Sequence, residues 1–201
     1  ARAPRLIVAT GGLSIPKMGA TGLAYDIARR FDHHVIKPEP ALVPFTFEGS
    51  IKETFASLSG VAAPVRARSG EGVFDEAMLF THRGLSGPAM LQVSSYWREG
   101  EAVEIDLFAG GDGVAMLRRL KAEHPGKSLT AALSAVFPRR LSEYLEASQM
   151  TPAVQRLADT SHALLDAAAQ RLSHWSLTPS GTEGWRTAEV TRGGVDTAGL
   201  S

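Results

Sequence analysis

The sequence contains no cysteine among its 201 residues. This absence excludes disulfides, thiol chemistry, iron–sulfur clusters and cysteine-based zinc sites. A surplus of charge is also missing, because 21 Lys and Arg balance 21 Asp and Glu. We therefore expect no nucleic-acid partner, which would need a cationic face. No apolar run approaches the roughly 18 residues of a membrane span, and the first residues lack the apolar stretch of a signal peptide. These features predict a cytoplasmic protein without a membrane partner.

The beginning of the chain has the pattern of an α/β protein. Residues 6–10 (LIVAT) are apolar and rich in β-branched side chains, which predicts a strand buried on both faces. A glycine-rich turn follows, and an amphipathic stretch at 23–31 predicts a helix. Because a buried parallel strand needs neighbours, we expect this chain to be cut out of a longer α/β protein.

Short strand candidates dominate the next part of the chain. Two long stretches hold them, 35–108 and the return at 176–191, with turns that contain glycine and proline. This spacing predicts one small β-barrel to which both stretches contribute. Between them, 114–172 has the period of helices, with Ser128 and Thr151 as expected N-caps. The predicted fold class is therefore α+β, a small β-barrel with a helical-bundle insert.

One candidate ligand site is the turn formed by Thr10, Gly11 and Gly12. A glycine pair directly after a buried strand lets a flat or phosphorylated ligand approach the backbone. A tight turn from strand to helix explains the same residues equally well. A second glycine string, Gly111–Gly113, lacks the third glycine of a dinucleotide fingerprint and predicts only a turn.

The densest polar string of the sequence is 80–90 (FTHRGLSGPAM). Ser86 is the expected N-cap of a helix that starts near Pro88, and backbone N–H groups at Gly87 and beyond then offer an anion or carbonyl site. Thr81 and His82 lie just upstream and supply a hydroxyl and an imidazole. The alternative is purely structural, with Ser86 as a cap and His82 packed in the core. No histidine has ligand spacing to another His or carboxylate, so we expect no metal.

Five strings in order carry a resemblance to a known family: 7–17, 19–22, 40–44, 80–88 and 190–195. Together they resemble the BaiN-like family of NAD(P)/FAD-dependent oxidoreductases. The resemblance covers both ends and the centre of the chain, whereas the helical insert matches in position more than in motif.

The resemblance implies a division of the chain into three parts. Residues 1–34 belong to a fragment of an FAD-binding α/β domain, 35–186 to an inserted β-barrel domain with a helical subdomain at about 114–172, and 187–201 return to the FAD-binding domain. The parent protein is then an oxidoreductase that moves hydride between NAD(P)H, FAD and an unidentified small organic acceptor. In that enzyme the turn at 10–12 contacts the cofactor, Thr81 and His82 face the substrate, and the backbone at 86–87 holds an anionic or carbonyl group.

The resemblance also predicts what the chain cannot do alone. The strand–GxGxxG–helix unit that binds the FAD pyrophosphate is absent from these residues, so we expect the chain alone to be folded, colourless and inactive. Two further classes stay open. One is a non-catalytic β-barrel module that covers a partner, and the other is an RNA-binding barrel, which the neutral charge disfavours.

Overall fold

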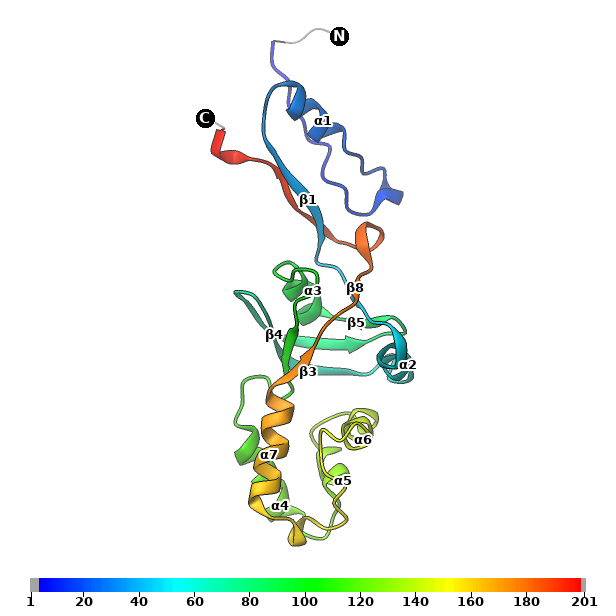
Figure 1. The fold of residues 1–201 in the computed structure, drawn as a ribbon, viewed down its shortest axis with the longest axis vertical. Helices are drawn as coiled ribbons and strands as arrows, with labels where there is room; N and C mark the ends of the chain where they lie inside the picture. The colour runs from blue at the N-terminus through cyan, green and yellow to red at the C-terminus, as the bar shows by residue number, and fades with distance from the viewer. Residues whose placement is uncertain (1–3, 200–201) are drawn as a thin grey trace.

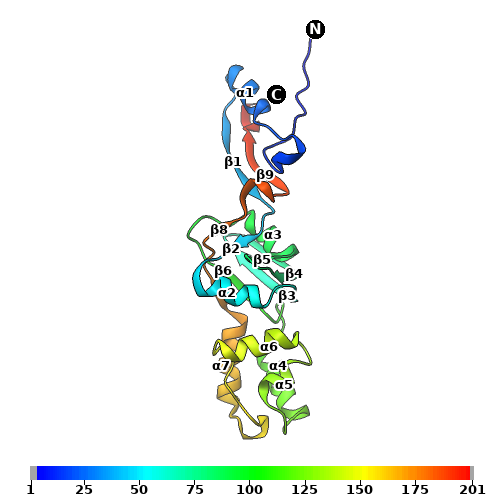
Figure 2. The ribbon, with the colours of Figure 1, turned by 90° about the vertical axis from the view of Figure 1, so that its right-hand side faces the viewer.

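The computed structural model describes residues 4–199. The molecule is elongated, and its parts follow one another along the long axis (Figure 1). A two-stranded ribbon and helix α1 (Leu23–Arg30) lie at one end, a seven-stranded sheet lies in the middle, and a group of helices forms the other end. The view turned by 90° shows the same three parts in the same order (Figure 2). The fold is mixed α+β, as the sequence predicts.

The central sheet has the strand order β7-β6-β3-β4-β5-β2-β8, with antiparallel pairing throughout. Its strands are β2 (Phe45–Thr46), β3 (Ala62–Ser69), β4 (Gly72–Phe80), β5 (Gly84–Ser86), β6 (Val103–Asp106), β7 (Trp175–Leu177) and β8 (Gly181–Thr182). The edge strands β7 and β8 are consecutive in the chain, so about 15 Å at most separates Leu177 from Gly181. The sheet must therefore curl until its edges approach. It is an open barrel, because β7 and β8 do not pair.

The inside of this barrel is filled with apolar side chains. Buried and exposed residues alternate along β3, which places Ala63, Val65 and Ala67 in the core. Helix α2 (Gly49–Ser57) adds Phe55, whose ring lies edge-on to Phe80 at 5.2 Å between centroids. Each fully buried side chain of this size contributes about 1.5–3 kcal/mol. Helix α3 (Pro88–Ser94) packs on β3 and β4 and completes this core.

The helices between β6 and β7 form the far end of the molecule (Figure 1). They are α4 (Gly113–Glu123), α5 (Leu129–Leu133), α6 (Arg139–Ala147), the 3-10 turn η2 (Leu157–Asp159) and α7 (His162–Ser173). Asp112, Ser128 and Ser161 cap α4, α5 and α7 by accepting a backbone N–H. The cap predicted at Ser128 is confirmed, and the one at Thr151 is wrong. Thr151 is buried ahead of an irregular stretch, and the next α-helix begins only at His162.

Strands β1 (Val35–Ala41) and β9 (Val190–Val195) pair with each other in a separate antiparallel ribbon. The expected pairing of the return with the first β region is thus confirmed, but the expectation of a single barrel is wrong. Only β7 and β8 of the return join the central sheet. Three 3-10 turns complete this end of the chain: η1 (Pro16–Met18), η3 (Gly184–Arg186) and η4 (Thr197–Gly199).

The strand predicted at residues 6–10 does not form. This segment is irregular, and Leu6 and Ile7 expose 73% and 90% of their surface. A strand exists only when another strand satisfies its N–H and C=O groups, and no described strand lies beside this segment. The helix predicted at 23–31 is confirmed as α1.

Candidate functional site

Thr10, Gly11 and Gly12 line one cavity of about 450 Å³ near the start of strand β9. Tyr25 of helix α1 and Glu189 also line it. The structure therefore brings together the three residues predicted to contact a cofactor, and their role stays a prediction.

The glycine turn is fixed to strand β9 by one side chain. The Oγ1 of Thr191 accepts a hydrogen bond from the backbone N–H of Leu13 at 3.0 Å, and the Oγ of Ser14 lies 3.0 Å from the same atom. Gly12 lies against Thr191 and the hydroxyl of Tyr25 with no room for a side chain. Residues far apart in the sequence thus hold the turn in place.

The lining of this cavity favours an uncharged group that can approach the backbone closely. Gly11 has φ of +73°, and nothing lies within 4 Å of the position where a Cβ would stand, so its backbone is open to a ligand. Glu189 is the charged group among the lining residues, and a carboxylate disfavours a phosphate. These residues therefore fit the ring system of a flavin better than its pyrophosphate.

The loop between β4 and β5 is held by the hydroxyl of Thr81. Its Oγ1 accepts hydrogen bonds from the N–H groups of Arg83 at 3.3 Å and Gly84 at 3.1 Å. His82 lies exposed at the tip of this turn. The alternative in which His82 packs in the core is therefore wrong.

Ser86 does not cap helix α3. It lies in β5 opposite Leu79, and Gly87 is the N-cap residue, without a side-chain cap. Gly87 has φ of +89°, and a Cβ there would lie 2.7 Å from the carbonyl oxygen of Ala77. The chain turns from strand to helix within this one glycine, so Ser86 is one residue too early to cap. The expected cap at Ser86 is wrong, whereas the start of the helix at Pro88 is confirmed.

The structure does not place the loop and the glycine turn in one cavity, because neither Thr81 nor His82 lines the cavity of the turn. Turn η3 connects the two regions. The carboxylate of Glu183 lies 3.9 Å from the guanidinium of Arg83. Two residues further on, the carbonyl of Trp185 accepts a hydrogen bond from the N–H of Ile15 at 3.0 Å.

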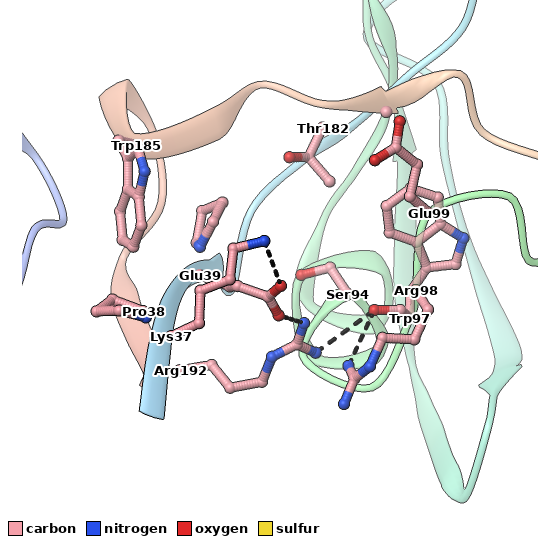
Figure 3. A pocket seen from close by; sticks show the side chains of 12 residues that line it. Lys37, Pro38, Glu39, Ser94, Trp97, Arg98, Glu99, Thr182, Trp185 and Arg192 are labelled. Carbon is pink, nitrogen blue, oxygen red and sulfur yellow. Dashed lines mark hydrogen bonds and ion pairs between the residues drawn. The ribbon is translucent and has the colours of Figure 1, made fainter. Parts of the chain in front are cut away.

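A second cavity of about 450 Å³ lies where the ribbon meets the barrel (Figure 3). Lys37 and Glu39 of β1, Trp185 of η3, Arg98 after α3 and Arg192 of β9 line it. The guanidinium of Arg192 binds the Glu39 carboxylate and donates to the carbonyl of Ser95 at 2.6 Å. The hydrogen bond from Arg192 holds the pKa of the Glu39 carboxyl below its usual range, so Glu39 is ionised at neutral pH.

Sequence reasoning missed this second cavity. Arg192 stands in the string 190–195 that carried the family resemblance, which is the one signal that pointed to it. The two cavities lie on either side of β9. Successive side chains of a strand point to opposite faces, and Thr191 holds the glycine turn while Arg192 lines the second cavity.

Within residues 4–199, no group of three His, Asp or Glu side chains is placed to hold a metal ion. None of the helices in this range is long and apolar enough to cross a membrane.

Comparisons with known proteins identify a family and several relatives of this chain. Residues 39–190 match the family described as the HI0933-like protein barrel and H2TH domain. The chain is 45% identical to the ribosomal RNA dihydrouridine synthase of Escherichia coli (strain K12) and 43% identical to that of Haemophilus influenzae, over 98% of this chain and 49% of each relative. It is 30% identical over 97% of its length to the 3-dehydro-bile acid delta(4,6)-reductase of Clostridium scindens, of which it covers 50%.

The chain thus spans about half the length of the curated relatives it matches. The predicted resemblance to flavin-dependent oxidoreductases is confirmed at the level of this wider family, and the relatives do not single out its BaiN-like members. The match covers most of the chain, including the barrel and the helical end. The protein described here belongs to the HI0933-like protein barrel and H2TH domain family.

Proposed function

We propose that the protein containing this chain is a flavin-dependent reductase that saturates the C5–C6 double bond of uridine in ribosomal RNA. The observation that carries this proposal is the identity of 45% and 43%, over 98% of the chain, with two relatives named for that activity. The proposal departs from our expectation of a partner other than nucleic acid. That expectation rested on the net charge of the whole chain, whereas binding of RNA depends on local groups of cations.

The third relative supports the reaction class. A delta(4,6)-reductase acting on a 3-dehydro-bile acid reduces carbon–carbon double bonds next to a ketone, by its name. The C5–C6 bond of uracil is likewise conjugated to a carbonyl, at C4. Both reactions add hydride to the carbon remote from the carbonyl and a proton to the carbon beside it. A steroid-like enone is therefore the second candidate substrate.

In this proposal the residues of the glycine turn would hold a flavin, which would supply the hydride chemistry for C6 of uracil with NAD(P)H as the reductant. Gly11 lets the ring system approach the backbone because nothing occupies its Cβ position, whereas Gly12 lets the turn pack against Thr191 and Tyr25. The hydroxyl of Thr10 is a donor at the same cavity. The cofactor's pyrophosphate needs groups that these residues lack, so the chain alone stays colourless in this account. The domain boundaries near residues 34 and 186 are part of the same proposal.

The proton that reaches C5 of uracil needs a donor of its own. His82 is our candidate, because its imidazole is exposed at the tip of the β4–β5 loop and the Thr81 hydroxyl fixes that loop. This role requires His82 and the glycine turn to meet at the bound substrate, since the loop does not line the cavity of the turn. The backbone at Ser86 and Gly87 remains our candidate for the substrate carbonyl. The reaction balances as uridine, NAD(P)H and one proton giving dihydrouridine and NAD(P)⁺.

The test uses the purified full-length protein under anaerobic conditions. We expect a flavin spectrum that NADPH or NADH bleaches and that ribosomal RNA lacking dihydrouridine restores. Restoration by a steroid enone and not by RNA would favour the second candidate. A protein without flavin would contradict both.

A further inference from the structure

Of the three tryptophans, only Trp185, which lines the second cavity, has an indole exposed enough to stack against a ligand. Trp97 and Trp175 are each only 7% exposed, whereas Trp185 is half-buried and lines the cavity. Figure 3 shows its indole at one side of the cavity, with the ring nitrogen turned inward. No described residue accepts a hydrogen bond from that N–H group. An aromatic face and a donor are thus available to a ligand.

Two cations, Lys37 and Arg98, line the same cavity as this indole (Figure 3). The Arg98 guanidinium donates only to the backbone carbonyls of Tyr96 at 3.4 Å and Trp97 at 3.2 Å, and within residues 4–199 it forms no ion pair. The side chain of Lys37 is 85% exposed, and its Nζ lies 3.5 Å from a Glu39 carboxylate that already binds Arg192. The positive charge of Arg98 and part of that of Lys37 are therefore available to an anion.

Glu99 also lines this cavity and limits the negative charge that a ligand can carry. Its carboxylate disfavours a ligand that carries several phosphates, and a single phosphodiester needs only one or two cations. An aromatic platform beside a few cations is the arrangement with which proteins bind single-stranded nucleic acid. The neutral net charge of the chain does not oppose this, because the cations lie in one cavity.

We infer that this cavity binds one nucleotide of single-stranded RNA, with its base stacked on Trp185 and its phosphate held by Lys37 and Arg98. This inference rests on the proposed function. The bound nucleotide is not the one that reacts. Arg192 and Thr191 point to opposite sides of β9, so the strand separates this cavity from the glycine turn. The cavity instead anchors a neighbouring nucleotide and sets which part of the RNA reaches the reaction site.

The experiment measures binding of a fluorescently labelled oligouridine to the full-length protein by anisotropy, without NAD(P)H. Trp185→Ala should weaken binding roughly tenfold, because a stacked base is lost, while Trp185→Phe should stay within about twofold of the natural protein. Lys37→Gln and Arg98→Gln should each make the dependence of log affinity on log salt shallower by about 0.7. Lys127→Gln, an exposed lysine in the loop between α4 and α5, is the matched control and should leave this slope unchanged.

Three outcomes separate the inference from the proposed function. Weaker binding by the Trp185, Lys37 and Arg98 variants, with unchanged thermal midpoints, supports the inference. Tight binding that none of these variants affects overturns the inference and leaves the proposed function intact. No binding of oligouridine or ribosomal RNA by the natural full-length protein contradicts both the RNA substrate and its anchor.

Discussion

Gly12 and Thr191 lie so close that a Cβ on the glycine would stand 2.3 Å from the threonine Oγ1 and 2.7 Å from its Cβ. Both atoms belong to a β-branched side chain whose rotamer is restricted. The threonine also accepts the N–H of Leu13, so it cannot rotate away without breaking that hydrogen bond. This contact fixes the position of the backbone that we assign to the flavin.

Gly12→Ala should therefore lower the free energy of unfolding by about 1–3 kcal/mol, the usual cost of overpacking. In the full-length protein it should also lower the flavin content, because the turn must move. Gly126→Ala is the matched control, since nothing lies within 4 Å of that Cβ position. Urea unfolding and the flavin-to-protein absorbance ratio measure both effects. If both variants had the same free energy of unfolding and the same flavin content, the turn would have no role in binding the flavin.

Ser86→Ala should change the free energy of unfolding by less than about 0.5 kcal/mol, because no cap is lost. Ser161→Ala should cost about 1 kcal/mol, because the Ser161 hydroxyl accepts the N–H of Leu164 at the start of α7. Thermal or urea unfolding of the two variants side by side tests this difference. A larger loss at Ser86 than at Ser161 would show that the serine supports α3 after all.

His82→Ala should leave the thermal midpoint unchanged, because the side chain is exposed and makes no described hydrogen bond. If its imidazole delivers the proton, turnover of the full-length protein should fall roughly 100-fold, with flavin content and the rate of flavin reduction by NAD(P)H unchanged. Stopped-flow absorbance separates the two half-reactions. Normal turnover would leave the loop without a chemical role.

The ion pair between Glu39 and Arg192 should make stability depend on pH in the acid range. The pKa of Glu39 is lowered in the folded state, so the unfolded state binds protons more readily. The stabilisation is complete above the ordinary glutamate pKa of about 4.3 and is lost as the pH falls through the lowered folded value. Unfolding of the natural protein and of Glu39→Gln should therefore differ most at pH 6 and converge toward pH 3. A constant difference across this range would contradict the ion pair.

The sequence predicts the central strands of the barrel well because their signal is local. Buried and exposed residues alternate along β3, and both β3 and β4 lie within the stretch 35–108 in which short strands are expected. Two strands joined by a short hairpin, each with exposed and buried residues, need no distant information to be recognised. The helix start at Pro88 is likewise visible, because proline is favoured in the first helical turn.

Distant contacts explain what the sequence does not predict. Strands β1 and β9 form a separate ribbon in which Pro40 pairs with Thr191. Nothing in the local sequence of either strand shows that it pairs in this ribbon and not in the barrel. The glycine turn at 10–12 is visible as a motif, but its partner Thr191 is not. The second cavity forms only where the ribbon meets the barrel, so its residues come from distant parts of the sequence. The local sequence around Trp185 therefore does not indicate that this residue lines a cavity.

The most direct test of this account is the nucleoside composition of ribosomal RNA treated with the enzyme. Ribosomal RNA without dihydrouridine is incubated with the purified full-length protein and NADPH or NADH, digested to nucleosides and analysed by mass spectrometry. We predict a dihydrouridine peak, heavier than uridine by the mass of one dihydrogen, that requires both enzyme and reductant. The absence of that peak from a reaction in which the flavin is bound and reduced by NAD(P)H would contradict the proposed function.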